Sequence, residues 1–225
     1  MPKLRKEVPD ETDLELLALL YYKGKATATE LAKEIELSKA TISDRLKWLA
    51  EKGYLEEPEI DISTGKLRKV YKSPSKEKLK SAFLEYYRTE IYEPVTEEFA
   101  IGVKYSSLEE AYKDYPLEKA YEDDRINWLS SIPATILRKL REGISLKNAA
   151  KLLIQENWKY PYSEILGCEL FGLIAVENGI VKLTEKGLKA ILNEWIPEIK
   201  EKLKELRELD FEAYKKLLAE FCNDL

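Results

Sequence analysis

The clearest hydrophobic pattern in the chain lies between residues 26 and 71. Ile42, Leu46 and Leu49 repeat at intervals of four and three, which places them on one face of a helix. We predict that this helix runs from Lys39 to Lys52. Its opposite face carries small, hydroxyl and basic side chains and is expected to be exposed.

A shorter helix precedes this one. Thr27 and Glu30 have the spacing of a capping box, in which a hydroxyl and a carboxylate satisfy backbone N–H groups at a helix start. We predict a helix over residues 28–35, a turn at residues 36–37, and a cap at Ser38 for the helix that follows. Two helices joined in this way predict a helix-turn-helix.

A leading helix and a hairpin flank the pair. The leading helix is predicted over residues 14–22, with Asp13 as its cap, and its leucines complete a three-helix core. Residues 60–62 and 67–71 are predicted to form two strands joined by a turn at residues 63–66.

The hairpin and the residues after it are strongly basic. From Ser63 to Lys80 the chain has seven Lys or Arg and one acid, Glu77. Affinity for DNA comes largely from neutralising backbone phosphates, so we predict that this hairpin and the outer face of the second helix bind DNA. The predicted contact residues are Lys39, Ala40, Thr41, Ser43, Asp44, Arg45, Lys47, Ser63, Thr64, Gly65, Lys66, Arg68 and Lys69.

The stretch ATELAKEIELSKATISDRLKWLAEKGYLE (residues 28–56), together with the leading helix and the hairpin, resembles the winged helix-turn-helix regulators of the MarR/ArsR type. The resemblance covers the first third of the chain. It implies double-stranded DNA as a partner and a dimer formed through the helix after the hairpin. Two alternatives to DNA binding remain. Winged helices also serve as protein-docking modules, and Lys-rich hairpins are often only the solvated edge of a sheet.

The middle of the chain is less regular. Ser75 opens a predicted helix whose apolar stripe fits either that dimer helix or an ordinary core helix. Residues 85–125 hold twelve acids, five bases and seven of the 14 tyrosines, and Pro94 and Pro116 predict short helices joined by turns. Three interpretations of this segment are open. A tyrosine-rich acidic surface is favoured at protein interfaces. The tyrosines also fit an aromatic ligand pocket, or an ordinary core with solvated acidic faces.

From residue 131 the predicted elements repeat the earlier order of three helices and a hairpin. The residues that mark them are Pro133, Ser145, Ser163, the pair Asn178-Gly179 and Thr184. This order predicts a second winged-helix-like unit. From Tyr160 to Val181 its charged residues are all glutamates, which a polyanion would repel. We therefore expect it to pack against a protein partner or another copy of itself rather than against DNA.

Composition narrows the chemistry. The chain has no histidine, and Cys168 and Cys222 lie far apart, so a zinc site has little support and Cys168 is expected in a core. Phosphate-binding loops, dinucleotide fingerprints and nucleophile elbows are missing. We therefore predict no enzyme activity, no cofactor and no metal. The net charge is -5, although the basic residues gather locally around the hairpin.

Location and source follow from the same composition. No apolar run is long enough for a membrane helix, and the N-terminus has no apolar core behind its charges, so a cytoplasmic protein is expected. Abundant Lys and Glu with scarce His, Met and Cys are typical of thermophiles.

These predictions combine into a mainly α fold with small β-hairpin wings and two winged-helix units. The predicted parts are a flexible basic arm (1–12), a DNA-binding domain (13–74), a helical, acidic, Tyr-rich linker or dimerisation region (75–130), the second unit (131–190) and C-terminal helices (191–225).

The predicted function is that of a sequence-specific DNA-binding transcriptional regulator acting as a homodimer. The competing hypothesis is a tandem winged-helix assembly factor of a chromosome-segregation or replication complex, which would mainly bind protein. A tandem winged-helix replication initiator would need a basic second unit.

Overall fold

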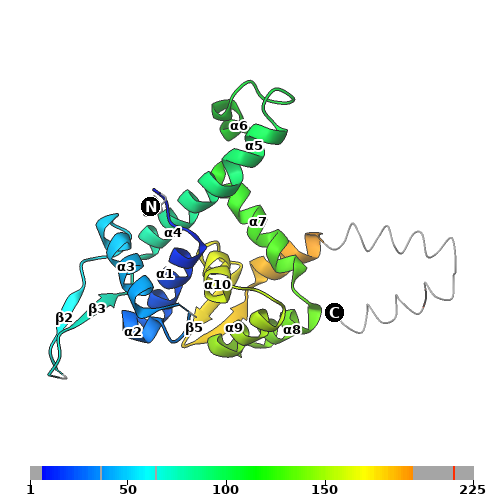
Figure 1. Cartoon of the computed structure of the whole chain (residues 1–225). Helices are drawn as coiled ribbons and strands as arrows, with labels where there is room; N and C mark the ends of the chain where they lie inside the picture. Colours follow the sequence, from blue (N-terminus) through cyan, green and yellow to red (C-terminus); the bar gives the residue numbers. More distant parts are fainter. Residues whose placement is uncertain (1–6, 36, 64, 195–214, 216–225) are drawn as a thin grey trace.

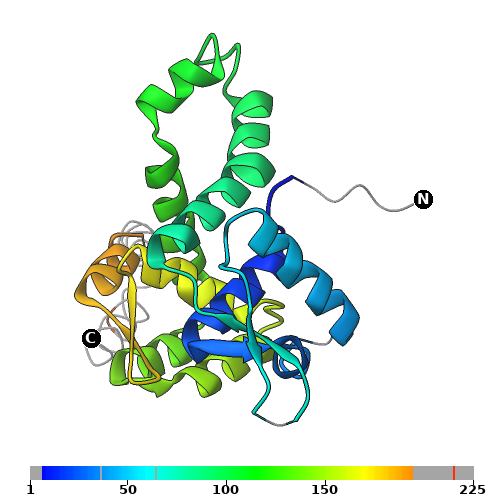
Figure 2. The same ribbon diagram turned by 90° about the vertical axis from the view of Figure 1, so that its left-hand side faces the viewer.

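The structure, a computed structural model, describes residues 7–35, 37–63, 65–194 and 215. Within these residues the chain forms two helical units, each with a small antiparallel sheet, and a long helical arm that projects from them (Figures 1 and 2). The mainly helical character with small antiparallel sheets agrees with the predicted fold class.

The first unit contains three helices and three short strands. Their bounds are α1 (Glu11–Lys23), β1 (Lys25–Thr27), α2 (Ala28–Leu31), α3 (Lys39–Glu51), β2 (Glu59–Asp61) and β3 (Arg68–Lys72). The strands form an antiparallel sheet in the order β1-β3-β2, with Ala26 opposite Tyr71 and Ile60 opposite Lys69. Strand β1 was not predicted, because three residues are too few to show an alternating pattern.

Side-chain caps fix the starts of α2 and α3 as predicted. Thr27 and Glu30 form a reciprocal capping box at α2. The hydroxyl of Ser38 accepts a hydrogen bond of 3.1 Å from the backbone N–H of Thr41 at the start of α3. These contacts satisfy donors that have no partner within a helix.

Two helix boundaries differ from the prediction. The cap of α1 is Asp10, and Asp13 lies in the first turn, where it completes a capping box. Helix α1 therefore begins inside the segment 1–12 that was expected to be a flexible arm. Helix α2 ends at Leu31, and the chain continues as a turn in which the backbone N–H groups of Lys33 and Glu34 make i→i−3 hydrogen bonds.

Helix α1 is buried on all sides. Every residue from Thr12 to Leu20 is buried, which is typical of a central helix rather than of an amphipathic surface helix. On α3, the predicted core residues Ile42, Leu46 and Leu49 are each 0% exposed.

The arm is built from α4 (Lys76–Tyr87), η1 (Arg88–Tyr92), α5 (Glu93–Phe99), α6 (Leu108–Asp114) and α7 (Leu117–Ser131). The first three elements lead away from the body, α6 lies at the tip, and α7 returns (Figure 1). The predicted break at Pro94 is wrong, because the chain stays helical through it. Pro94, which has no N–H to donate, lies in the first turn of α5, directly after the π-helical turn η1.

Tyrosines pack between the two legs of the arm. The rings of Tyr87 and Tyr121 meet edge to face with centroids 5.0 Å apart, and Tyr92 stacks on Tyr112 at 5.3 Å. The Tyr87 hydroxyl donates to the backbone oxygen of Ala120 at 3.2 Å. Burial raises the pKa of Tyr87 to about 12, so its hydroxyl remains a neutral donor. These tyrosines are core residues of the arm.

The apolar stripe of α4 also belongs to a core. Leu79, Phe83 and Tyr87 are buried, and α4 contacts α1, α7 and α10 of the same chain. The apolar stripe of α4 was expected to serve either a dimer interface or the core. In the structure it packs in the core.

The second unit repeats the element order of the first. Its elements are α8 (Ala134–Glu142), β4 (Ile144–Ser145), α9 (Leu146–Gln155), α10 (Pro161–Leu170), β5 (Ile174–Glu177) and β6 (Ile180–Leu183). The sheet order β4-β6-β5 matches β1-β3-β2. Asn178 and Gly179 both have positive φ, 51° and 74°, which gives the tight two-residue turn that the sequence predicted.

Helix α10 packs on α1 and joins the two units. The backbone N–H groups of Tyr162 and Ser163 donate to the buried carboxylate of Glu15 at 3.2 and 2.6 Å. At the other end of α10, the Tyr22 hydroxyl donates to Glu169 at 3.0 Å. The unpaired N–H groups at a helix start stabilise a carboxylate placed there. The third helix of the second unit is thus covered by its own chain, where a separate partner had been expected.

Several further sequence predictions can be compared with the structure. Cys168 is 0% exposed, as expected of a core residue. Thr184 caps the helical residues 185–194 by accepting from the Gly187 N–H at 3.0 Å. Cys222 lies outside the described residues, as do the C-terminal helices predicted over residues 191–225, apart from residues 191–194 and 215. Among the described helices, none has the length and apolar character needed to cross a membrane.

The contact between Glu15 and α10 predicts pH-dependent stability. Burial raises the pKa of Glu15 to about 7, from an ordinary 4.5, despite the hydrogen bonds from Ser163 and Tyr162. The folded state therefore binds the proton more tightly than the unfolded state, and its stability falls as pH rises from 4.5 through 7. A pKa difference of this size changes the free energy of unfolding by roughly 3 kcal/mol between low and high pH.

We expect Glu15→Gln to lose most of this dependence, because glutamine does not ionise. The measurement is the free energy of unfolding in urea at about pH 5 and pH 8. The exposed Glu51→Gln is the matched control and should follow the wild type. Equal pH slopes for the wild type and Glu15→Gln would contradict the prediction.

Candidate nucleic-acid interface

The outer face of α3 is open to solvent. Its exposed side chains are Lys39, Ala40, Thr41, Asp44 and Lys47, and Ser43 is half-buried. Since the apolar face of α3 is fixed in the core, these predicted contact residues share the outward side of one helix. The structure thus brings the helix part of the predicted site together as one surface.

Arg45 occupies a different environment from its neighbours. Its guanidinium lies 2.7 Å from the carboxylate of Asp10 and 2.8 Å from that of Asp13, at the start of α1. The Asp13 side chain is only 5% exposed. Burial alone would lower the pKa of Arg45, but the hydrogen bonds to the two aspartates raise it. Arg45 therefore ties α3 to α1, a role that sequence reasoning did not assign to it.

The wing is the hairpin formed by β2 and β3, and it projects away from the body (Figures 1 and 2). Its turn is held by the Asp61 carboxylate, which accepts from the Ser63 N–H at 2.8 Å, and by Gly65 with a φ of 72°. The predicted contact residues Ser63, Gly65, Lys66, Arg68 and Lys69 are all exposed, and Thr64 lies outside the described residues.

Two exposed apolar side chains of the wing were missed by the sequence prediction. Ile62 is 67% exposed and Leu67 is 79% exposed, one on each side of the turn. Apolar side chains of this kind are found inserted into minor grooves. Their exposure could have been expected from the sequence, because both lie beside the predicted turn, and the end of a hairpin is far from the core.

Strand β1 adds another base to this region. Lys25 is exposed and lies opposite Lys72 in the β1–β3 register. Lys72 itself is 2.6 Å from the carboxylate of Glu59 on β2. Lys25 was absent from the predicted site because β1 was not predicted.

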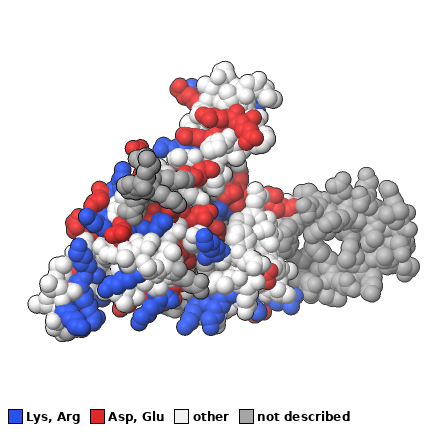
Figure 3. Space-filling view, viewed as in Figure 1, with Lys and Arg blue, Asp and Glu red and all other residues white. Residues whose placement is uncertain are grey.

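The surface charge is divided between two regions. In Figure 3, Lys and Arg atoms gather on the wing and along the lower edge of the molecule, whereas Asp and Glu gather on the arm and the middle. The basic residues around the wing are thus grouped on the visible face and are not covered by the acidic middle of the chain.

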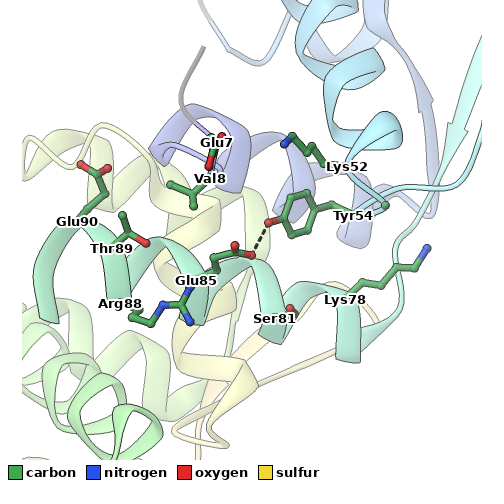
Figure 4. Close-up of a pocket in the computed structure, with 11 residues that line it drawn as sticks. Glu7, Val8, Lys52, Tyr54, Lys78, Ser81, Glu85, Arg88, Thr89 and Glu90 are labelled. Carbon is green, nitrogen blue, oxygen red and sulfur yellow. Dashed lines mark hydrogen bonds between the residues drawn. The ribbon is translucent and has the colours of Figure 1, made fainter. Parts of the chain in front are cut away.

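The end of α3 is linked to the arm across an open groove. The groove has a volume of about 790 Å³ and is lined from the α3 end by Lys52 and Tyr54 (Figure 4). The Tyr54 hydroxyl donates to Glu85 of α4 at 2.5 Å, and burial together with this carboxylate raises the pKa of Tyr54. This contact fixes the first unit relative to the arm. Side chains of both signs line the groove, including Lys78 and Arg88.

The acids of α10 point to internal partners. Glu164 forms an ion pair with Arg125 of α7, and Glu169 contacts Tyr22 and lies 3.5 Å from Lys76. Burial raises the pKa of Glu164 in spite of the attraction of Arg125. Two of the three glutamates that suggested repulsion of DNA are therefore contacts within the chain, whereas the third, Glu177 of β5, is exposed.

A comparison with protein families supports this description of the first unit. Residues 9–56 match the family described as winged helix-turn-helix DNA-binding. The match covers α1, β1, α2 and α3 and ends before the wing. No curated protein matches the chain significantly. The N-terminal part of the chain thus carries a winged helix-turn-helix DNA-binding domain.

Among the residues that the structure describes, no group of three or more His, Cys, Asp and Glu side chains could hold a metal ion. The candidate site is the exposed polar and basic surface of α3 and the wing, because it belongs to or directly follows the matched residues.

Arg45 provides a test of the local architecture. Replacing it with alanine would leave the buried Asp13 carboxylate without its cationic partner. We expect Arg45→Ala to lower the free energy of unfolding by about 2 kcal/mol, less than for a fully buried pair because Arg45 keeps some exposure. The measurement is urea denaturation near neutral pH.

Lys47→Ala is the matched control on the same helix. Lys47 lies 3.5 Å from Glu51 in an exposed i,i+4 pair, which contributes little to stability. Arg45→Ala and Lys47→Ala variants of equal stability would show that Arg45 does not anchor α3.

Proposed function

We propose that this protein is a sequence-specific DNA-binding transcriptional regulator that acts as a dimer. The observation that carries the proposal is the match of residues 9–56 to a winged helix-turn-helix DNA-binding family, joined to an exposed basic wing that follows directly. Base edges in the major groove are read by side chains of a helix, while basic side chains beside it fix the position on the phosphates.

In the proposed complex α3 enters the major groove. Lys39, Ala40, Thr41, Ser43 and Asp44 are nearest the base edges, and Lys47 flanks them. The wing lies along the phosphates through Ser63, Thr64, Gly65, Lys66, Arg68 and Lys69, with Ile62 and Leu67 at the adjacent minor groove. Arg45 contributes by holding α3 against α1, since its guanidinium is already bound by two carboxylates.

We infer that the second unit is also a winged helix, because its element order and sheet order equal those of the first. Its third helix, α10, is not available to a groove because it packs on α1. The same burial argues against the competing hypothesis in which α10 docks a separate protein.

The tip of the arm supports the proposed dimer. Val95 is 49% exposed, Phe99 67% and Val103 88%; Val95 and Phe99 lie four residues apart on α5, and Val103 lies in the loop after it. The tip lies at the opposite end of the molecule from the wing (Figure 1), so a second copy bound there would leave the DNA-facing side free. Apolar side chains gathered at such a site are typical of protein interfaces.

DNA binding is tested with the double variant Lys66→Ala/Lys69→Ala. A gel shift against the upstream region of the protein's own gene should show saturable binding that survives competitor DNA. Loss of two phosphate contacts should weaken binding to all sequences and reduce the slope of log K against log salt by about 2.

The matched control is Lys119→Ala/Lys186→Ala, which removes the same charge beside α7, away from the wing and from the tip of the arm. Both lysines are exposed and pair with acids of α7, Asp123 and Glu122. Equal affinity and equal salt slope for the wing variant and this control would reject the proposed docking mode. A wild-type protein that binds no duplex would favour the assembly-factor hypothesis.

The dimer is tested with Phe99→Ser/Val103→Ser. Both side chains are exposed, so the variant should keep its helical circular dichroism while its mass by light scattering falls from dimer to monomer. A wild-type protein that is monomeric at micromolar concentration, or a variant that stays dimeric, would contradict an interface at the tip.

A further inference from the structure

The first two helices of the second unit are basic on their outer faces. Residues 134–160 contain six Lys or Arg and two Glu, in contrast to the acidic segment that follows. All eight side chains are exposed, and they are Arg138, Lys139, Arg141, Lys147, Lys151, Lys159, Glu142 and Glu156. Because the acids of α10 are held by internal partners, the charge that this unit presents on α8 and α9 is positive.

Helix α9 presents two of these bases together. Lys147 and Lys151 are four residues apart, so they share one exposed face, while Ala150 and Leu153 face the core. Neither lysine has a carboxylate within ion-pair distance among the described residues. Their ammonium groups are therefore directed to solvent and are not neutralised within the described part of the chain.

A third base extends the same surface from the sheet. Lys182 on β6 is exposed, and its side-chain carbons pass within 4.0 Å of the position that a Cβ atom would take at Gly143. Gly143 follows directly after α8, so Lys182 lies beside the end of that helix.

The basic surface of the second unit lies on the same edge of the molecule as the wing. In Figure 3, Lys and Arg atoms follow the lower edge of the molecule from the wing to the region over α9 and α8. Acidic atoms are sparse along this edge and dense on the arm above it. A long, uniformly charged polyanion matches an edge of this kind better than a compact ligand does, since phosphates recur along the whole duplex.

We propose that the duplex bound by α3 and the wing continues along this edge, where its phosphates contact Lys147 and Lys151 of α9. This inference rests on the proposed function and enlarges its DNA-binding surface. The second unit then contributes to DNA binding through its second helix, while its third helix remains packed on α1. Lysines act here as point charges on phosphates, so they add affinity and register without reading sequence.

The test compares three variants of the full chain: Lys147→Ala/Lys151→Ala on α9, Lys66→Ala/Lys69→Ala on the wing, and the control Lys119→Ala/Lys186→Ala beside α7. Binding is measured by fluorescence anisotropy over a range of salt concentrations. The probes are a duplex of about 30 base pairs from the protein's own upstream region, roughly 100 Å long, and a series shortened from either end.

We expect the α9 variant to bind the longest duplex more weakly and with a salt slope lower by about 2 than that of the control. Shortening the duplex should abolish the difference between the wild type and the α9 variant while the effect of the wing variant persists. An α9 variant that binds like the control, beside a weakened wing variant, overturns this inference and leaves the proposed function intact. A wing variant that binds like the control overturns the proposed function itself.

Discussion

The arrangement of the described structure depends on the burial of α1, which lies between the rest of the first unit and α10 of the second. A helix buried on every side must satisfy its polar groups within the protein, and α1 carries two acids in that position, Asp13 at 4% exposure and Glu15 at 3%. Asp13 is satisfied by Arg45 of α3, and Glu15 by the backbone N–H groups at the start of α10. A buried carboxylate without such partners is costly, so each acid fixes the helix that supplies its donors.

The contacts of Asp13 and Glu15 leave two equivalent helices in different environments: α3 has an exposed face, and α10 is covered. Helix α3 is held by its flank, which leaves its polar face outward. Helix α10 is held by its N-terminus and buried along its length, so its acidic residues become internal contacts. Glu164 meets Arg125, and Glu169 meets Tyr22. The same element order thus produces one exposed candidate recognition helix and one structural helix.

Local features of the fold could be predicted from the sequence because their causes are local. The cap at Ser38, the buried series Ile42, Leu46 and Leu49, and the turn at Asn178-Gly179 each depend on residues within a few positions of one another. The outer face of α3 follows from the same periodicity.

Contacts between distant segments could not be predicted in the same way. Glu15 and Ser163 are 148 residues apart, and nothing in either segment indicates that they meet. Arg45 was assigned to DNA because it is basic and flanks the outer face of α3. Its partner Asp10 belongs to a segment that was expected to be a flexible arm, so the contact between them was not foreseen. One signal was available: Leu16 and Leu19 lie off the face marked by Leu14 and Leu17, so α1 has apolar residues on more than one side.

Charge distribution reconciles a net charge of -5 with the proposed DNA-binding surface. Electrostatic interactions between exposed charges are screened over a distance of about 8 Å at physiological ionic strength. The acids of the projecting arm therefore have little influence on phosphates at the lower edge, where Lys and Arg dominate (Figure 3). A duplex that approaches the arm itself comes within reach of these acids and is repelled by them. A chain with separated charge can thus bind a polyanion on one side and resist non-specific binding on the other.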